Sequence, residues 1–294
     1  MKKSLINRKM DKGIQKEFNA IGRLMDSFVD YGDIMYKRLY DECGSNELNA
    51  PLFTLLAHIL NMVDGVAIMS KKGASEGMIP LCRSMFEAAL YFEYMYTEPK
   101  DRGVIAYQVH SCYQEIKLRE MFDSNTNSGK KHRGIFTNEF SGFEEVQDIP
   151  VSESCKHLFN FLKRKEIQNV KDAWDKKKPK NWYSLYTDLR NLRDLARYLN
   201  VEARYVFLYK RASEFIHAGA TMKNIKVGNG VGGVSLRNYE EVPFYSSMTF
   251  SIITEIFMLI GKEEFALWYI NNAKKQVERT SRLNIMVEYE IAKL

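Results

Sequence analysis

The 294-residue chain is poor in residues that interrupt regular structure, with only 17 glycines and 6 prolines. β-Sandwiches need frequent turn residues between short strands, so this scarcity argues against an all-β fold. The four cysteines, at positions 43, 82, 112 and 155, lack the close spacing that zinc sites and redox motifs require. The pattern predicts reduced thiols in a cytoplasmic protein, with no metal and no other cofactor.

Long hydrophobic runs are also missing. A membrane-spanning helix needs about 20 predominantly apolar residues. The longest run free of Asp, Glu, Lys and Arg, 48–63, contains Pro51, His58 and Asn61, and the longer apolar stretch 242–261 is interrupted by Glu255. The first ten residues carry basic side chains but no apolar segment typical of a signal peptide. We therefore expect no membrane partner.

Charge of neither sign dominates, because 43 Lys and Arg oppose 37 Asp and Glu for a formal net charge of +6. A mild basic excess suits a nucleic-acid partner, but many proteins without such a partner share it. Composition therefore leaves an RNA partner open and does not require one.

Apolar residues recur at helical spacing along most of the chain. Between Ile14 and Leu39 they repeat every three or four positions and skip one turn at Gly32, which predicts a long amphipathic helix that ends near Gly44. Similar patterns predict helices over 52–63, 75–92, 105–121, 157–162, 185–199, 205–216, 243–260 and 263–281. Apolar residues that flank the glycine-rich stretch 228–233 predict a small β-hairpin near 225–236.

These patterns predict an all-α fold: a single multi-helix bundle domain of about eight to ten helices. We expect residues 1–45 to form an N-terminal amphipathic helix that packs on a helical core domain of residues 46–294. Two polar stretches without periodicity, near 123–154 and 168–182, are expected to be flexible loops.

The first pair of residues that could carry chemistry is Arg83 with Glu87. Four positions apart on a largely apolar helix, they lie about 40° from one another and can pair directly. A buried guanidinium needs a carboxylate partner, so the pair is either a structural ion pair or an arginine held for an anion.

Tyr209, Ser213 and His217 follow one another at intervals of four in a segment with apolar neighbours. On a helix this spacing places the three side chains along one face. Histidine can transfer protons near neutral pH, and hydroxyl groups can orient its ring. A neutral, hydrogen-bonded histidine is also common in packed helices, so the catalytic and structural interpretations both stay open.

The segments Arg83-Ser-Met-Phe-Glu87 and Tyr209-Lys-Arg-Ala-Ser213-Glu-Phe-Ile-His217 resemble two helices of the bacterial domain-of-unknown-function family numbered 5677. The resemblance covers roughly residues 50–220, and its motifs are short. It implies a helical fold in which these two helices face each other. It also implies that Arg83, Glu87, Ser213 and His217 form one polar cluster.

A looser resemblance is to HEPN ribonucleases, which are helical, often dimeric, and marked by an Arg followed four to six residues later by a His. Arg211 and His217 fit that spacing. The resemblance implies RNA cleavage without metal, with the histidine in proton transfer and the arginine on phosphate. Ala212 stands where those enzymes usually have a polar residue, and Arg211 and His217 lie about 240° apart on a regular helix. Arg83 could replace Arg211 if the two helices pack together.

Two basic stretches could contact phosphates: one contains Lys130 and Lys131, and the other spans 171–180. Trp174 and Trp182 lie near the second stretch and could stack on bases. Exposed lysine-rich loops are usually only solvated, which is the alternative interpretation.

Two functions of different classes follow. The first is a metal-independent, RNA-cleaving effector of HEPN type in bacterial defence or toxin function. Its expected catalytic residues are His217, Arg83, Glu87 and Ser213, and its expected substrate-binding residues are Tyr209, Arg211, Lys130 and Lys131. The second is a non-catalytic helical sensor or protein-interaction module, in which an Arg-Glu-Ser-His network fixes helix packing. Its partner would be another protein or a second copy in a homodimer.

Overall fold

The computed structural model describes residues 10–140, 142, 148–216, 225–228, 231–234 and 238–279. The chain forms two compact units, the first within residues 1–94 and 192–294 and the second within residues 95–191. Regular structure in the described residues is almost entirely helical, which confirms the predicted all-α fold. The division into two units is finer than the single helical core expected over residues 46–294.

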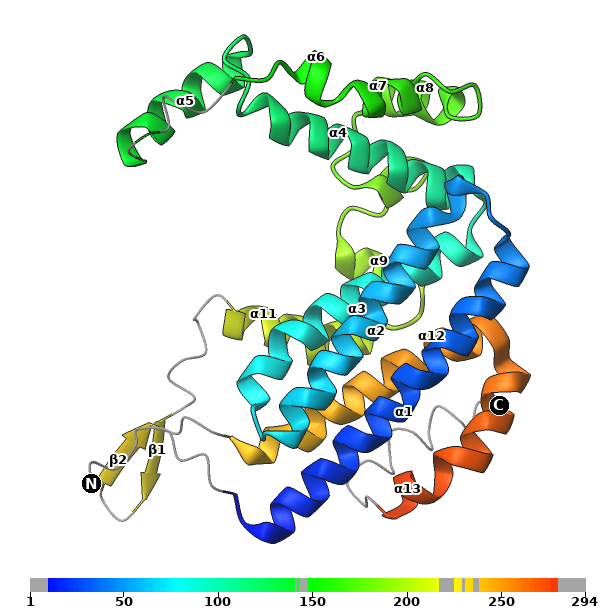
Figure 1. The fold of residues 1–294 in the computed structure, drawn as a ribbon, viewed down its shortest axis with the longest axis vertical. Helices are drawn as coiled ribbons and strands as arrows, with labels where there is room; N and C mark the ends of the chain where they lie inside the picture. Colours follow the sequence, from blue (N-terminus) through cyan, green and yellow to red (C-terminus); the bar gives the residue numbers. More distant parts are fainter. Residues whose placement is uncertain are drawn as a thin grey trace. The chain divides into compact units, whose positions relative to one another are not determined.

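Four long helices build the first unit (Figure 1): α1 (Lys12–Cys43), α2 (Ala50–Lys71), α3 (Ser75–Thr97, whose last turn belongs to the second unit) and α12 (Val242–Asn272). Helix α1 packs on α2 and α12, and α2 also packs on α12. The ring of Phe28 on α1 contacts the rings of Phe250, Phe257 and Phe265 on α12. The apolar stripe predicted for α1 is buried from Phe18 to Leu39 and forms this core.

Glycines explain why the stripe on α1 skips one turn. A Cβ atom on Gly32 would lie 2.5 Å from a methyl carbon of Leu60 on α2. One on Gly22 would lie 2.4 Å from Lys71 Cγ, also on α2. Because glycine has no side chain, α1 and α2 can pack closely at these two positions.

The remaining elements of the first unit are shorter. A helical stretch over 202–216 consists of α10 (Glu202–Arg204), the π-helical turn η5 (Tyr205–Lys210) and α11 (Arg211–Ile216). The others are η1 (Glu47–Asn49), α9 (Leu192–Tyr198), η7 (Tyr239–Glu241) and α13 (Lys274–Arg279). These short pieces raise the number of helical segments above the predicted eight to ten.

Two local predictions at the C-terminal side of the first unit are confirmed. Strands β1 (Ile225–Gly228) and β2 (Val231–Val234) pair antiparallel, with Ile225 opposite Val234, and form the predicted hairpin. The boundary predicted between helices 243–260 and 263–281 coincides with Gly261, whose non-helical backbone (φ −159°, ψ 76°) kinks α12.

In the second unit, α4 (Ala106–Glu120) is the central element. It contacts η2 (Asp101–Ile105), α6 (Val151–Ser154), α7 (Lys156–Leu162), α8 (Gln168–Lys177) and η4 (Trp182–Ser184). Buried apolar side chains of α4, among them Val109 and Ile116, form the core of this unit together with Leu162, Val170 and Trp174.

The two predicted loops are wrong over much of their length, because both contain helices. Helix α5 (Asn127–Glu139) occupies the first, and α8 occupies the second. The Thr126 hydroxyl caps α5 by accepting a hydrogen bond from Gly129 N at 2.8 Å. Helix α5 is largely exposed and therefore shows no apolar periodicity, which is why the sequence pattern missed it.

The helix predicted over 185–199 begins only at Leu192, so this prediction is half wrong. Side chains in the preceding segment satisfy the backbone locally: the Ser184 hydroxyl donates to Leu189 O, and the Thr187 hydroxyl donates to Tyr183 O. The ammonium group of Lys177 also donates to three carbonyl oxygens of this segment. Such bonds compete with a helix for the same backbone groups.

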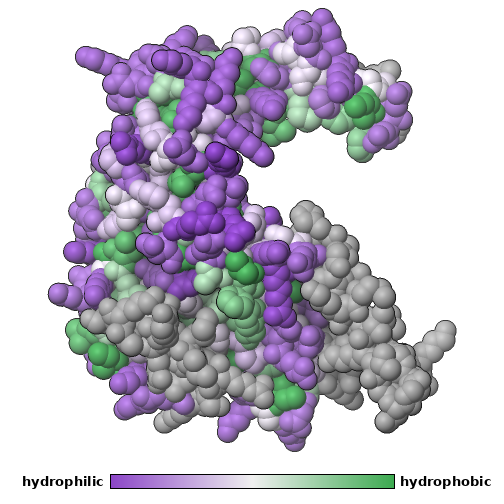
Figure 2. Space-filling view, turned by 180° about the vertical axis from the view of Figure 1, so that it is seen from behind, coloured by the Kyte–Doolittle hydropathy of each residue, from purple (hydrophilic) through white to green (hydrophobic). Residues whose placement is uncertain are grey.

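Two stretches, Glu47–Lys71 and Tyr239–Asn272, are long and apolar enough to cross a membrane, judged by length and composition alone. Both contain core helices of the first unit, and 72% of the apolar window in the second stretch is buried. Core helices of ordinary globular proteins pass the same test, so the predicted absence of a membrane partner stays a prediction. Figure 2 shows mainly hydrophilic residues on the visible described surface, with hydrophobic ones in separate patches.

Candidate functional site

Helix α3 and the helical stretch 202–216 meet through four polar residues, which we call the Arg83 cluster: Arg83, Glu87, Tyr209 and Ser213. The Arg83 guanidinium donates from Nε to Ser213 Oγ (3.1 Å) and from Nη2 to the Tyr209 hydroxyl (2.7 Å). The Tyr209 hydroxyl in turn donates to Glu87 Oε2 at 3.4 Å. All four residues are half-buried. The predicted proximity of these residues is therefore observed, while their chemical roles stay predictions.

The direct ion pair that the spacing of Arg83 and Glu87 suggested is not formed among the described residues. The Tyr209 hydroxyl is hydrogen-bonded to both groups and links them. The guanidinium is thus held by two neutral hydroxyl groups and contacts the carboxylate only through one of them. Its positive charge is oriented without being directly neutralised.

Aromatic rings surround the Arg83 cluster. The guanidinium carbon of Arg83 lies 4.5 Å from the centre of the Tyr209 ring, within range of a cation–π interaction. Tyr205 stacks on Tyr209 with 5.1 Å between ring centres, and the Tyr91 hydroxyl donates to Glu87 Oε1 at 3.0 Å. Burial raises the pKa of Tyr209, and the nearby Glu87 carboxylate raises it further. Tyr209 therefore keeps its proton and acts as a donor at neutral pH.

Tyr91 and Tyr205 were missed by the sequence analysis. Each lies four positions from a predicted site residue, Tyr91 after Glu87 and Tyr205 before Tyr209. Side chains at this spacing share one helix face, so the same rule that selected the cluster could have added them.

The π-helical turn η5 carries Tyr205 and Tyr209 into the cluster. π-Helical turns are rare in proteins, and those that occur often lie at functional sites. The following helix α11 returns to ordinary geometry at Arg211 and carries Ser213, which contacts the same Arg83 guanidinium as Tyr209 does. His217 directly follows α11 in sequence and lies outside the described residues.

Arg211 does not join the Arg83 cluster. Its Nη2 atom pairs with Glu241 at 2.7 and 2.8 Å, and its guanidinium lies 5.1 Å from the Phe244 ring centre. Two positions along a helix from either Tyr209 or Ser213, Arg211 points to another face. The expectation that Arg211 shares a substrate site with Tyr209 is therefore not met by this geometry.

A second group of charged residues, which we call the Glu93 cluster, lies between α3, α10 and α12. It consists of Glu93, Arg204 and Glu255, and Arg204 Nη1 pairs with Glu255 Oε2. Burial first and the Glu255 charge second raise the pKa of Glu93 to about 7, although Arg204 lowers it. Sequence analysis missed this cluster because its three members come from separate segments without any local spacing.

The Glu93 cluster borders a pocket of about 340 Å³. Its lining combines Glu93 and Glu255 with apolar side chains of α12 and with the loop after α9. In that loop Asn200 adopts the left-handed conformation (φ 61°), which asparagine tolerates better than most residues.

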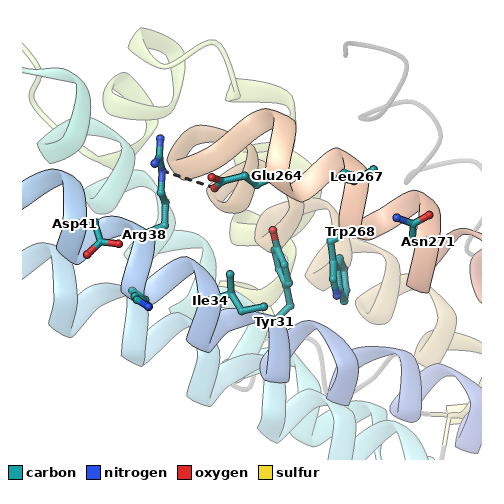
Figure 3. A pocket seen from close by; sticks show the side chains of 9 residues that line it. Tyr31, Ile34, Arg38, Asp41, Glu264, Leu267, Trp268 and Asn271 are labelled. Carbon is teal, nitrogen blue, oxygen red and sulfur yellow. Dashed lines mark ion pairs between the residues drawn. The ribbon is translucent and has the colours of Figure 1, made fainter.

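A third candidate is an open pocket of about 470 Å³ between α1 and the end of α12 (Figure 3). Tyr31 stacks on Trp268 with 4.3 Å between ring centres, and Arg38 at the rim pairs with Glu264 at 3.7 Å. Burial, and next the charge of Glu264, raises the pKa of Tyr31 to about 12. Figure 3 shows this ion pair at the rim and the rings of Tyr31 and Trp268 on the wall, while Lys37 and Asp41 add further charge to the lining.

The remaining predicted contacts with nucleic acid divide into two groups. Lys130 and Lys131 lie exposed on α5 of the second unit. Trp174 and Trp182 are only 7% and 3% exposed and pack inside that unit, so the expectation that they stack on bases is wrong. Among the residues that the structure describes, no three His, Cys, Asp or Glu side chains gather in a way that could hold a metal ion.

These features define a helical protein with a half-buried Arg-Tyr-Ser-Glu cluster between two helices. The model of the family of unknown function DUF5677 matches residues 49–230, which is more than half of the chain and includes all four cluster residues. The chain therefore belongs to this family. No curated protein and no solved structure matches the chain.

Proposed function

We propose that this protein is a metal-independent, RNA-cleaving effector of HEPN type that acts in the cytoplasm in bacterial defence or as a toxin. In this proposal Arg83, Tyr209 and Ser213 contact the phosphate that is cleaved. Glu87 and His217 are the groups that accept and donate protons.

One observation carries the proposal: Arg83 is held by hydroxyl groups, whereas two other arginines in this region are paired with carboxylates. Arg204 pairs with Glu255, and Arg211 pairs with Glu241. Arg83 donates to Tyr209 and Ser213 instead. A guanidinium oriented by neutral groups keeps its charge for a phosphate, to which arginine donates in a planar, bidentate geometry.

The chemistry of RNA cleavage without metal fits this set of groups. A base removes the proton of the ribose 2′-hydroxyl, the 2′-oxygen forms a bond to phosphorus, and the bond from phosphorus to the 5′-oxygen breaks as an acid supplies a proton. A carboxylate and an imidazole can serve as base and acid. A positioned guanidinium stabilises the charge that develops on the phosphate oxygens.

The test compares RNA cleavage by the purified full chain and by a His217→Ala variant, with chelator present to remove metal ions. We expect the variant to lose roughly 10²- to 10⁴-fold in rate, the usual contribution of a general acid or base. Arg197→Ala is the matched control, because Arg197 is an exposed arginine on α9 that pairs with Glu202 away from the cluster. Equal cleavage by wild type and His217→Ala, or cleavage by neither, removes the proposal.

A second candidate is favoured by the fact that two donor groups of Arg83 are already bonded within the protein. The cluster could then be a structural network in a helical sensor or protein-interaction module, whose partner is another protein or a second copy. This candidate predicts no RNA cleavage and a marked loss of thermal stability in His217→Ala. An unchanged melting temperature together with the loss of a cellular phenotype would exclude it.

A further inference from the structure

Helix α5 of the second unit carries two exposed lysines, and an exposed aromatic side chain lies at each of its ends. Phe122 precedes the helix and is 48% exposed, and Phe140 follows it and is 59% exposed. Phe136 lies between them: its ring is nearly parallel to that of Phe122 (5.5 Å between centres, 11° between planes) and 6.5 Å from that of Phe140. With Lys130 and Lys131, these three rings form what we call the α5 surface.

Hydrogen bonds and close packing fix the first turn of helix α5, which carries the α5 surface. The Thr126 hydroxyl donates to Glu120 O at 2.7 Å while it caps α5. Gly129 packs so tightly that a Cβ atom there would lie 1.8 Å from Asp123 O. Asp123 itself accepts from Val151 N at 2.8 Å, and such backbone hydrogen bonds lower its pKa. The aromatic rings are therefore presented by an ordered element.

The charge of the α5 surface calls for an anionic partner. Lys130 and Lys131 are exposed, and neither forms an ion pair with any residue in the described part of the chain. Arg133 on the same helix lies 3.9 Å from Asp148. Glu139 is the one carboxylate in the α5 sequence, so positive charge prevails along the helix.

Building on the proposed function, we infer that the α5 surface binds single-stranded RNA. The exposed rings at the two ends of α5 and the unpaired lysines of the helix match the two needs of such a ligand, because bases stack on aromatic faces while cations track the phosphates. Base faces inside a duplex are covered by neighbouring bases and cannot stack on protein rings. A single strand is therefore the form of RNA that suits this surface. A lipid surface would need a continuous apolar face, but the exposed Ile135 lies between Lys131 and Glu139 on the helix.

Binding is measured by fluorescence anisotropy with a labelled uridine oligonucleotide of about 12 nucleotides, a length typical of such sites. The full-length His217→Ala protein serves as the parent, so that cleavage cannot consume the probe. We expect Phe122→Ala and Phe140→Ala each to weaken binding about tenfold, the order of one lost stacking contact. Lys130→Ala with Lys131→Ala should lower the slope of log affinity against log salt by about 1.4, as two lost phosphate contacts require.

Matched controls come from the same unit. Lys163→Ala with Lys165→Ala removes two exposed lysines away from α5, and Tyr186→Ala removes a 38%-exposed ring. Both controls should bind as the parent does. Helical circular dichroism and melting temperature show whether each variant is folded.

The outcomes separate this inference from the proposed function. Binding lost only in the α5 variants supports the inference, even when the wild type cleaves no RNA and the proposed function has failed. Unchanged binding in folded α5 variants overturns the inference, even when the wild type does cleave RNA. Absence of RNA binding by the parent, or α5-dependent binding to phosphatidylserine vesicles in place of RNA, overturns it as well.

Discussion

The Arg83 cluster and the Glu93 cluster both involve helix α3, and each contains one arginine. They differ in what meets the guanidinium. In the Glu93 cluster a carboxylate pairs with Arg204, and burial favours a proton on Glu93. In the Arg83 cluster two hydroxyl groups meet the guanidinium. The first arrangement pairs its arginine with a carboxylate, whereas the second orients its arginine with neutral groups. Under the proposed function, arginine therefore serves stability in the Glu93 cluster and phosphate binding in the Arg83 cluster.

The largest expected difference between the clusters concerns activity. If the proposed function holds, Arg83→Ala should reduce RNA cleavage by about 10²- to 10³-fold, because it removes the cation proposed to stabilise the developing phosphate charge. Single-turnover rates with excess protein measure this loss. A cleavage rate close to that of the wild type in a folded Arg83→Ala protein would contradict the division of roles.

Arg204→Ala should act on stability. It leaves Glu255 partly buried without its cation, and the free energy of unfolding should fall by about 3 kcal/mol, the lower end of the cost of breaking a buried pair. Urea unfolding measures the change. Arg197→Ala, which removes an arginine with a 58%-exposed side chain, is the control and should change stability little. A loss as small as that of the control would show that the Glu93 cluster is not a structural ion pair.

The pH dependence of stability should sharpen the contrast. Because the pKa of Glu93 is raised to about 7 in the folded protein, above its unfolded value of about 4.3, its proton stabilises the fold. This contribution is complete below the unfolded pKa and is lost as pH rises through 7. Between about pH 5 and about pH 8, wild type should lose about 2.5 kcal/mol more than Glu93→Gln. Parallel stability curves for the two proteins in urea titrations would contradict the raised pKa.

Tyr209→Phe should have the smallest effect on stability. It removes the hydroxyl that links Arg83 to Glu87 but keeps the ring against the guanidinium. We expect a loss of about 1 kcal/mol, the usual net value of one hydrogen bond. Ser213→Ala, which removes the other hydroxyl partner of Arg83, is the companion variant for the same thermal unfolding measurement. A double variant whose loss exceeds the sum of the two single losses would indicate that the hydroxyls act as one network.

Much of the fold could be predicted, because the apolar side chains of buried helices recur at helical spacing in the sequence. The stripe from Phe18 to Leu39 is buried as expected, and the small hairpin lies where alternating valines flank glycine. Helix α5 could not be predicted in this way. It is stabilised at its start by Thr126 and Gly129, and its exposed faces carry no period.

The candidate site was predictable only where its members share a helix. Spacing of four grouped Arg83 with Glu87 and Tyr209 with Ser213, and the family resemblance supplied the pairing of the two helices. No spacing could indicate that Tyr209 would link Arg83 to Glu87, because that depends on how the helices pack. The same holds for Glu93, whose neighbours Arg204 and Glu255 are more than 100 positions away in sequence.

The π-helical turn η5 has a consequence for how this region can change. A π turn holds one residue more than the α-helical turn it replaces, so its loss amounts to deleting a single amino acid between Tyr205 and Lys210. Such a deletion would turn η5 into an ordinary α-helical turn and would leave Ser213 facing Arg83 as before. Helix α11 holds no extra residue, so deletion of Ala212 would rotate Ser213 and everything after it by about 100° relative to α3. The chain can thus lose one codon within η5 and keep the cluster, whereas the same loss a few positions later would separate Ser213 from Arg83.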